Sequence, residues 1–380
     1  MLACCPDHCR SVSILQFYRL AFILLASTIL LPATLMAQVT PAKSAQGQQS
    51  QQPYVPQLTP EQQAAQRKAA QEAYAEHQRQ QQEALERATQ APAGFPLPAN
   101  QAEYVEQLLD HWQKVSDQVT EYKCNFQRYD YDNAQVNYRD PKSNQLAAFN
   151  IAYGEVRYAA KDKASFETSR MFKFKNPPKQ PGGEVEWEPV EGYSVWGKTI
   201  HERWVCDGTS VYDFDFVGKR MYETAIPSDL QGNVVESPIP FLFGANKQDI
   251  MKRYWVRYVP KYTTNAKGEK ELIQDQYWLE AYPKTISDAQ MYSKLEIVLA
   301  AKDFMPVAMH MYSTQYDGSK NFASRYFYFE DRQTNGQLQK FQNFFKVFVR
   351  PKLPLGWEQA KRTYGGSRSA KTNQQGGGVR

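Results

Sequence analysis

Histidine and cysteine supply many of the bases, nucleophiles and metal ligands of proteins, and both are scarce in this sequence. The chain has 380 residues but only five histidines and five cysteines. Cys4, Cys5 and Cys9 lie in the first ten residues. No CxxC pair and no histidine spacing typical of a zinc site accompanies the two cysteines that remain. The sequence therefore supports no metal centre, and we expect no cofactor.

Short motifs of the common enzyme classes are also missing. The sequence has no phosphate-binding P-loop and no dinucleotide-binding GxGxxG. The stretch GYSVWG has one residue too many between Ser194 and Gly197 for a nucleophile elbow. His201 and Glu202 begin like a zinc-protease motif, but Val205 stands where the second histidine would be. We therefore expect a non-enzymatic protein.

Long apolar runs are absent except near the N-terminus. Arg10 and Arg19 precede the run LAFILLASTILL at residues 20–31, and PATLMAQ follows it. This order gives the basic region, short apolar region and small-residue cleavage site of a signal peptide. We expect cleavage after Ala37, because a membrane-spanning helix needs roughly 20 apolar residues. The sequence predicts a periplasmic or secreted protein whose signal peptide covers residues 1–37.

Acidic residues are missing from the end of the chain. Residues 361–380 hold five basic side chains, so the 45 lysines and arginines of the whole chain fall to 40 without them, against 40 aspartates and glutamates. The positive excess is thus confined to a glycine-rich tail. We interpret it as a basic disordered tail, because a nucleic-acid-binding protein normally has a basic face on its folded part. No nucleic-acid partner is expected.

Residues 38–96 are rich in glutamine, alanine and proline. They cannot bury enough apolar surface to offset the entropy of ordering, about 1–2 kcal/mol per residue for the backbone. Residues 61–88 favour a helix but have no apolar stripe, which predicts a frayed, solvated helix rather than a coiled coil. We interpret this segment as a disordered or helical linker.

The domain that we place at residues 97–360 begins with an amphipathic helix. Asn100 and Glu103 have the spacing of a capping box. Apolar residues then recur on one helical face, namely Val105, Leu108, Leu109, Trp112, Val115 and Val119. About eleven short, aromatic-rich strands joined by local turns follow, which predicts an antiparallel meander. The predicted fold is mainly β with some α, an incomplete antiparallel β-barrel covered by the N-terminal helix and a short lid helix.

One connection between the predicted strands is unusually apolar. The sequence PIPFLFGANKQDIM places Phe241, Leu242 and Phe243 in succession, where polar residues are the norm. Such side chains must cover an apolar surface. Together with Ile250 and Met251 they form the predicted lid.

Cys124 lies in the alternating stretch TEYKCNFQRYDYD, and Cys206 lies at the end of HERWVC before the turn at Asp207-Gly208. In an oxidising compartment the two cysteines could form a disulfide. Each also has the apolar parity of its strand and could be a small buried hydrophobe. Their spacing does not decide between these alternatives.

Seven short motifs follow one another along residues 100–360: YKCNFQR, GEV, VCDG, PFLFG, YPK, KLEI and PLGW. In this order the sequence resembles the LolA-like superfamily, which comprises the periplasmic outer-membrane lipoprotein carriers and their relatives. The long glutamine-rich leader and the cysteine-bearing strands resemble a planctomycete-type subgroup of that superfamily. The carriers have an arginine followed by a proline at the end of the second strand, which holds their lid shut. Ala160 and Lys161 stand at that place here.

The resemblance implies a half-barrel whose hollow takes the acyl chains of a lipoprotein. Carried over, the residues that would line this cavity are Phe126, Val156, Trp204, Phe214, Leu295, Ile297, Met309 and Met311. The implied function is a periplasmic carrier or sensor that binds a lipid or an acylated protein and is peripheral to the membrane at most.

Two other interpretations remain open, because alternation does not distinguish a hollow barrel from a filled one. A solid sheet would indicate an interaction module for a protein partner in the cell envelope. A hollow could instead convert a small hydrophobic molecule, with Arg170, Glu223 or His310 as converging polar groups. A large curled sheet encloses more volume than its own side chains readily fill, which favours the hollow. Methionines near residue 310 suit a surface that accepts irregular chains.

Overall fold

The computed structural model describes residues 59–141, 143–159, 162–180, 183–228, 246–264, 268–313, 323–335 and 345–363. The predicted signal peptide, Phe241, Leu242 and Phe243 of the predicted lid, and the Ala160-Lys161 pair lie outside these ranges. Among the described helices, none combines the length and the apolar character needed to cross a bilayer.

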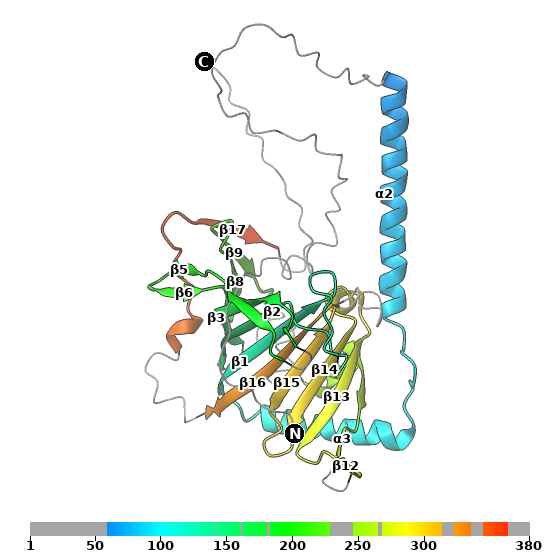
Figure 1. The fold of residues 1–380 in the computed structure, drawn as a ribbon, viewed down its shortest axis with the longest axis vertical. Helices are drawn as coiled ribbons and strands as arrows, with labels where there is room; N and C mark the ends of the chain where they lie inside the picture. Colours follow the sequence, from blue (N-terminus) through cyan, green and yellow to red (C-terminus); the bar gives the residue numbers. More distant parts are fainter. Residues whose placement is uncertain are drawn as a thin grey trace.

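A 13-stranded sheet dominates the fold (Figure 1). Its order is β10-β13-β14-β15-β16-β1-β2-β3-β7-β8-β9-β17, and β4 pairs with β3 beside this path. The pairs are antiparallel except for β17, which joins β9 in parallel. Small hairpins β5-β6 and β11-β12 form separate sheets. The sheet is open rather than closed into a barrel, which agrees with the predicted incomplete barrel, although it has more strands than predicted and one parallel pair.

The strands are β1 Glu121–Asp132, β2 Asn150–Ala159, β3 Lys163–Asn176, β4 Glu186–Pro189, β5 Tyr193–Val195, β6 Lys198–Ile200, β7 Glu202–Asp207, β8 Ser210–Asp215, β9 Arg220–Ala225, β10 Tyr254–Tyr258, β11 Tyr262–Thr264, β12 Lys270–Leu272, β13 Gln276–Pro283, β14 Lys294–Ala300, β15 Pro306–Tyr312, β16 Ala323–Thr334 and β17 Glu358–Arg362. The helices are α2 Pro60–Ala88, α3 Ala99–Ser116, α5 Lys247–Arg253, α6 Ile286–Ala289 and the 3₁₀ helix η2 Phe345–Phe348.

Two antiparallel meanders make up this sheet, and they meet at the pairing of β1 with β16. The register of this seam runs from Tyr122 opposite Thr334 to Asp132 opposite Ala323. Within the first meander the predicted turn after β7 is formed, and Gly208 has a φ of 96°. Glycine suits this left-handed backbone because it has no Cβ to clash with the carbonyl.

The predicted amphipathic helix is α3, but the predicted capping box is wrong. The helix begins at Ala99 after Pro98, no side chain caps it, and Asn100 already lies inside its first turn. Pro98 has its φ fixed near the helical value and so starts the helix earlier than the Asn100–Glu103 spacing indicates. The predicted apolar face is buried, with Leu109 and Trp112 almost fully enclosed.

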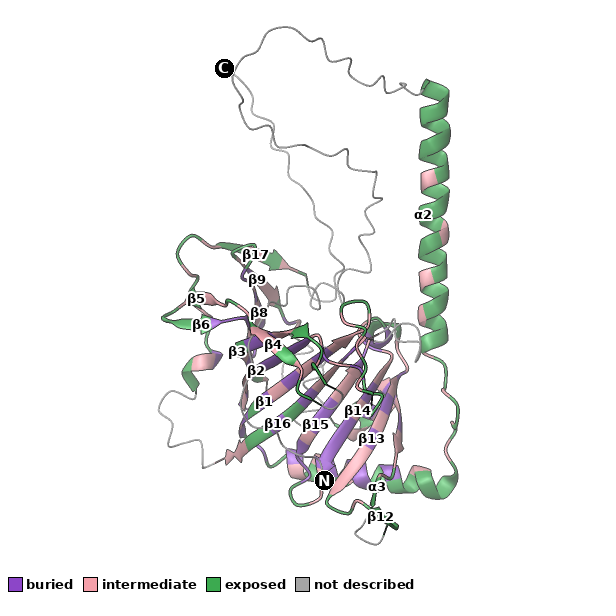
Figure 2. Ribbon diagram, viewed as in Figure 1, coloured by how far each residue is buried: buried purple, intermediate pink, exposed green. Residues whose placement is uncertain are grey.

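Within the leader, α2 is a helix without a single buried residue (Figure 2). A capping box between Thr59 and Gln62 begins it. The chain that follows α2 packs against β10, where Trp255 Nε1 donates to the Thr89 carbonyl at 3.4 Å and the Phe95 ring lies 5.7 Å from the Trp255 ring. The linker at residues 38–96 therefore contacts the sheet near its C-terminal end, through Thr89 and Phe95.

Each face of the sheet carries its own apolar core. We call the face that α3 covers the inner face, and it holds the largest cluster of buried residues. A second cluster lies on the outer face under the β5-β6 hairpin and contains Ile200, Val205, Tyr212, Phe214, Phe216 and Met221. The sheet thus has apolar side chains on both faces at β7 and β8, where simple alternation between an apolar and a polar face ends.

Cys124 and Cys206 are both buried and free, so the disulfide that the sequence left open is not formed. Cys124 pairs with Val156 on β2, and Cys206 pairs with Ala164 on β3. Two strands therefore lie between the cysteines, a path of about 14 Å at about 4.8 Å per strand. A disulfide needs Cα atoms within about 7 Å of each other. Both cysteines behave as small buried hydrophobes.

Candidate functional site

The inner face brings together seven of the eight residues predicted to line a cavity. Five of them are buried in the cluster that includes α3, namely Phe126, Val156, Leu295, Ile297 and Met309. Trp204 and Met311 are half-buried against that cluster. Ile250 of the predicted lid is buried in the same cluster, and its neighbour Met251 packs against it.

Phe214 is the exception, because it lies on the outer face in the second cluster. The register of the β7-β8 hairpin explains its position. Trp204 of the inner face is opposite Asp213, so the next residue on β8 points to the other side of the sheet. There Phe214 contacts the Trp196 ring at 5.3 Å and the Trp357 ring at 6.1 Å between centroids.

A row of stacked rings crosses the inner face from β1 to β7. The Phe126 ring lies 4.7 Å from the Phe166 ring, and Phe166 in turn lies 6.2 Å from Trp204, with each pair nearly parallel. Gly154 on the intervening β2 makes this row possible. A Cβ at Gly154 would lie 2.5 Å from Phe126 Cζ and 2.1 Å from the Glu167 carbonyl oxygen. The missing side chain leaves the space that the Phe126 ring occupies.

Five of the seven methionines that follow residue 37 lie in or against the inner-face cluster. Met305 and Met309 are buried, whereas Met251, Met291 and Met311 are half-buried. We call these three the methionine rim.

All three residues of the methionine rim lie at one end of the sheet. Met251 lies in α5, which leads directly into β10, and the first residue of β10, Tyr254, pairs with Pro283 at the end of β13. Met291 lies between β13 and β14, and the first residue of β14, Lys294, pairs with Tyr312 directly after Met311. The end of the inner face that carries the methionine rim therefore has the side chains best able to adapt to an irregular apolar ligand.

Buried charges adjoin the methionine rim. The ion network comprises Arg128, Asp130, Glu202 and Arg325. Arg128 is fully buried, and its Nη1 and Nη2 donate to the two carboxylate oxygens of Glu202 at 2.6 and 3.2 Å. Its Nε lies 3.2 Å from Asp130, which also accepts from Arg325 Nε at 2.8 Å. Two cations and two carboxylates give the network a net charge of zero.

Strand register places the ion network beside the rim. Met311 is opposite Arg325 on β16, and Arg325 is opposite Asp130 on β1. Arg128 is opposite Ala152 on β2, and this small residue leaves space for the long side chain to reach β7. The described inner face therefore has a large apolar cluster, and this ion network lies beside its methionine end.

The environment of Glu202 keeps its carboxyl ionised at neutral pH. Burial acts to raise its pKa, but the Arg128 guanidinium, aided by Arg325 and by the Thr168 hydroxyl, outweighs burial. The net pKa lies below the usual value. Thr168 Oγ1 donates to Glu202 Oε2 at 2.8 Å, so a neutral donor also holds this carboxylate in place.

The polar residues considered for catalysis do not converge. Arg170 on β3 stacks on the Tyr153 ring, and Glu223 on β9 accepts from Arg350 Nη2 at 3.1 Å. His310 on β15 lies 2.8 Å from Ser324 Oγ. These residues belong to strands well separated in the sheet order. Among the described residues, no group of three or more His, Cys, Asp and Glu side chains is placed to hold a metal ion.

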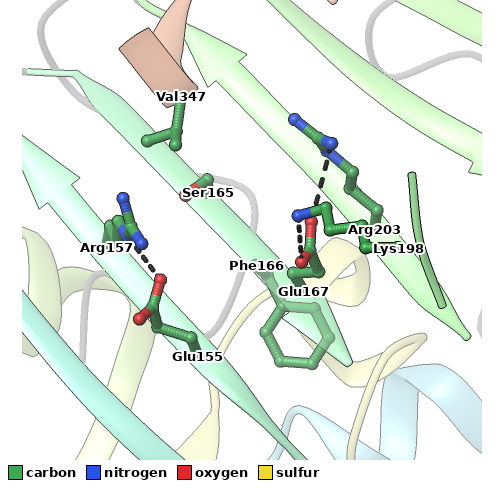
Figure 3. Close-up of a pocket in the computed structure, with 8 residues that line it drawn as sticks. All are labelled: Glu155, Arg157, Ser165, Phe166, Glu167, Lys198, Arg203 and Val347. Atoms are coloured by element: carbon green, nitrogen blue, oxygen red, sulfur yellow. Dashed lines mark hydrogen bonds and ion pairs between the residues drawn. The ribbon is translucent and has the colours of Figure 1, made fainter. Parts of the chain in front are cut away.

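A small pocket lies on the outer face between β2, β3, β6, β7 and η2 (Figure 3). Its volume is about 60 Å³, and it is lined by Glu155, Arg157, Ser165, Phe166, Glu167, Lys198, Arg203 and Val347. We call it the outer pocket. No local motif predicts it, because its charges come from the polar positions of several strands. Only the alternation of basic and acidic residues at those positions could have indicated it.

Each carboxylate at the outer pocket is shared by two cations. Glu155 pairs with Lys123 at 2.7 Å and with Arg157. Glu167 pairs with Lys198 and, at 3.5 Å, with Arg203. Arg157, Lys198 and Arg203 line the pocket and Lys123 does not, so three cations against two carboxylates leave the lining with an excess of one positive charge. Burial lowers the pKa of the Arg203 guanidinium, which also stacks on the Trp196 ring at 4.7 Å.

Comparison with known proteins gives low-identity similarities. No family model matches the sequence, and no curated protein matches it. A conserved protein from Thermus thermophilus, whose structure has been solved, is 10% identical and has a TM-score of 0.31, over 68% of this chain and 99% of its own. A LolA superfamily protein from Nitrosomonas europaea is 11% identical with a TM-score of 0.28, over 64% and 97%. The MucA/MucB complex of Pseudomonas aeruginosa contains a chain that is 12% identical with a TM-score of 0.25, over 61% and 57%.

Proposed function

We propose that this protein is a non-enzymatic periplasmic carrier or sensor that binds the acyl chains of a lipid or lipoprotein between α3 and the inner face of the sheet. The observation that carries the proposal is the concentration of methionine on that face. An unbranched thioether side chain adapts to irregular apolar shapes better than a branched one. A permanently packed core would not need three half-buried methionines, the methionine rim, at one end.

Acyl-chain binding requires space, and in the described chain α3 occupies the inner face with Leu109 and Trp112. Binding therefore means that α3 moves away from the sheet and the guest takes the place of some of its contacts. Each buried methylene group contributes about 0.8 kcal/mol. A chain of ten methylenes would thus contribute about 8 kcal/mol toward the cost of moving the helix.

The contacts between α3 and α5 suit a separable closure. Lys247 at the start of α5 donates its backbone N–H to Gln113 Oε1 at 2.9 Å. Its ammonium group lies 2.9 Å from Asp110 and 3.2 Å from Glu106. Partly exposed pairs of this kind contribute about 0–1 kcal/mol each, so they hold the helices together weakly. The methionine rim lies at the end of the sheet near α5, and we propose that the acyl chain enters between α3 and the sheet at this end.

The second candidate is an interaction module for an envelope protein, and the close packing of Leu109 and Trp112 against the sheet favours it. A core that never opens would leave only the surfaces of the sheet for a partner. The two functions differ in whether the inner face takes up lipid.

Lipid uptake can be tested with the chain that begins at Gln38, which retains every described residue. Purification without detergent, solvent extraction and mass spectrometry should recover bound lipid, and the emptied protein should bind a fluorescent fatty acid saturably. Met311→Glu should weaken that binding at least tenfold, because the apolar guest would bury a carboxylate. Leu272→Glu changes an exposed residue of β12 and is the matched control. Folded, lipid-free protein that binds no fatty acid would reject the carrier and support the interaction module.

A further inference from the structure

The segment that contains η2 and ends at Trp357 presents large apolar side chains to solvent. Val349 is 61% exposed, Leu353 is 38% exposed and Leu355 is fully exposed. Phe345 at the start of η2 is also exposed. Soluble proteins rarely gather so many exposed apolar residues in so short a stretch, and such gatherings mark sites of interaction.

Basic residues are interleaved with these apolar ones. Residues 345–357 read FKVFVRPKLPLGW, which includes Lys346, Arg350 and Lys352 and no aspartate or glutamate. All three basic side chains are exposed. An apolar surface interleaved with cations is the combination that binds anionic bilayer surfaces, where apolar burial and electrostatic attraction add.

Specific contacts with the sheet hold this segment in place. Trp196 Nε1 on the β5-β6 hairpin donates to the Lys352 carbonyl at 3.2 Å. Phe348 is buried, and the Trp357 ring lies 5.3 Å from the Phe216 ring. In Figure 1 the orange and red segment between η2 and β17 runs beside the hairpin. The exposed leucines therefore project from an anchored turn.

The outer pocket lies at the start of the same segment, because Val347 of η2 forms part of its lining (Figure 3). Its lining has one excess positive charge, which matches the single negative charge of a phosphate diester. Ser165 between the two groups of charges offers a hydroxyl donor. These features suit the oxygens of a phosphate group, which accept charge-assisted hydrogen bonds from arginine and lysine.

We propose that this cationic apolar surface, formed by residues 345–357 and the outer pocket, docks the protein on an anionic phospholipid bilayer. Leu353 and Leu355 enter the interfacial layer, and the outer pocket takes the phosphate of one lipid. We favour a lipid surface over an acidic protein because the apolar residues project singly from a turn and form no groove for a partner. The surface belongs to the outer face, so docking leaves α3 and the methionine rim accessible, and it does not depend on acyl-chain binding.

Vesicle co-sedimentation tests the proposal. The chain that begins at Gln38 is used, because the apolar run at residues 20–31 would itself enter vesicles. It should sediment with vesicles of phosphatidylglycerol and phosphatidylcholine but much less with phosphatidylcholine alone, and rising salt should weaken the binding. The absence of binding to anionic vesicles at low salt would overturn the proposal.

Substitutions at exposed positions separate docking from folding. Leu353→Ser with Leu355→Ser should weaken vesicle binding at least tenfold, since both side chains lose their apolar burial. Lys352→Gln should weaken it about fivefold, the effect of one basic side chain at an anionic surface. Leu272→Ser makes the same chemical change on exposed β12 and should leave binding unchanged. Equal loss in that control, or none in the leucine pair, would overturn the surface assignment.

The outer pocket could bind inorganic phosphate instead of the phosphate of a lipid, and competition distinguishes the two. Inorganic phosphate at millimolar concentration should compete only weakly with vesicles, and Arg157→Gln should lower vesicle binding without unfolding the chain, as checked by circular dichroism. Phosphate binding that is lost in Arg157→Gln, with no vesicle binding by the parent chain, would assign the pocket to a free anion and overturn docking. Capture of an acidic protein without vesicle binding would overturn it as well.

Discussion

Arg128 on β1 and Glu202 on β7 form a two-point ion pair although two strands lie between them. The Arg128 side chain crosses β2 above Ala152 to reach the Glu202 carboxylate, at 2.6 and 3.2 Å. The pair is buried and linked through Asp130 to Arg325 on β16. It therefore connects strands of both meanders from the inside of the fold.

Replacement of Arg128 by methionine should destabilise the protein by about 3–5 kcal/mol, because the buried Glu202 carboxylate would lose its ion-pair partner, whereas Asp130 keeps Arg325. Urea unfolding followed by tryptophan fluorescence measures this loss. The double variant Arg128→Met with Glu202→Met should recover part of it, since apolar residues of similar size often replace a buried ion pair at little cost. A loss below about 1 kcal/mol in the single variant would contradict the described network.

Gly154→Ala should destabilise the protein by about 2 kcal/mol or more, because its Cβ would overlap the Phe126 ring and the Glu167 carbonyl. Gly268→Ala is the matched control. Nothing lies within 4 Å of a Cβ at Gly268, so only its left-handed backbone, with a φ of 81°, opposes the change. That control should lose about 1 kcal/mol. Thermal unfolding of both variants measures the difference, and equal losses would count against the ring stacked over β2.

Acidification should destabilise the protein between pH 6.5 and about 4 through His310. Burial is the main cause that lowers the pKa of its imidazole, to about 4, and Lys294 adds to this effect while Glu296 opposes it. The unfolded chain therefore takes up a proton at a higher pH than the folded chain, and folding loses stability as pH falls through this window. The difference amounts to about 3 kcal/mol at the acid end.

His310→Gln is the variant that tests this pH dependence. Glutamine has no titrating group and can keep a hydrogen bond to Ser324 Oγ, which lies 2.8 Å from His310 Nε2. The stability of the variant should fall less steeply between pH 6.5 and 4 than that of the parent chain. Parallel curves of unfolding free energy against pH would show that His310 does not titrate as expected.

Native protein should react slowly with thiol reagents. Burial raises the pKa of the Cys124 thiol to about 12 and that of Cys206 to about 11. Thiolate is the reactive form, so at pH 8 the reactive fraction of Cys124 is on the order of one in ten thousand. The chain that begins at Gln38 should release two equivalents of chromophore from a disulfide reagent in urea and almost none when folded. A mass two hydrogens lighter than the reduced chain would reveal a disulfide instead.

Local features of the fold could be predicted from the sequence because they depend on neighbouring residues. The apolar face of α3 follows from spacing within one helix, and the turn at Gly208 follows from a single glycine that tolerates a positive φ. Strand alternation likewise placed Cys124 and Phe126 on one face of β1. In each case the physical cause lies within a few residues of the effect.

Features that depend on register between distant strands could not be predicted. Arg128 meets Glu202 only because β1, β2, β3 and β7 align as they do, and no local pattern fixes that alignment. Phe214 was assigned to the wrong face because β8 carries apolar residues on both faces, with Val211 inside and Tyr212 outside. The outer pocket depends in the same way on side chains from four strands and η2.

The seam between β1 and β16 governs the order in which the chain can fold. The partners of Tyr122 and Phe126 lie more than 200 positions further along the sequence, at Thr334 and Phe329. Synthesis proceeds from the N-terminus, so strands β1 to β9 are made before β16. Until β16 is made, the edge of β1 that pairs with it has no partner strand. Pairing over such distances is slow and leaves strand edges unprotected. We therefore expect β1 to require shielding during biogenesis, until the last third of the domain has been delivered.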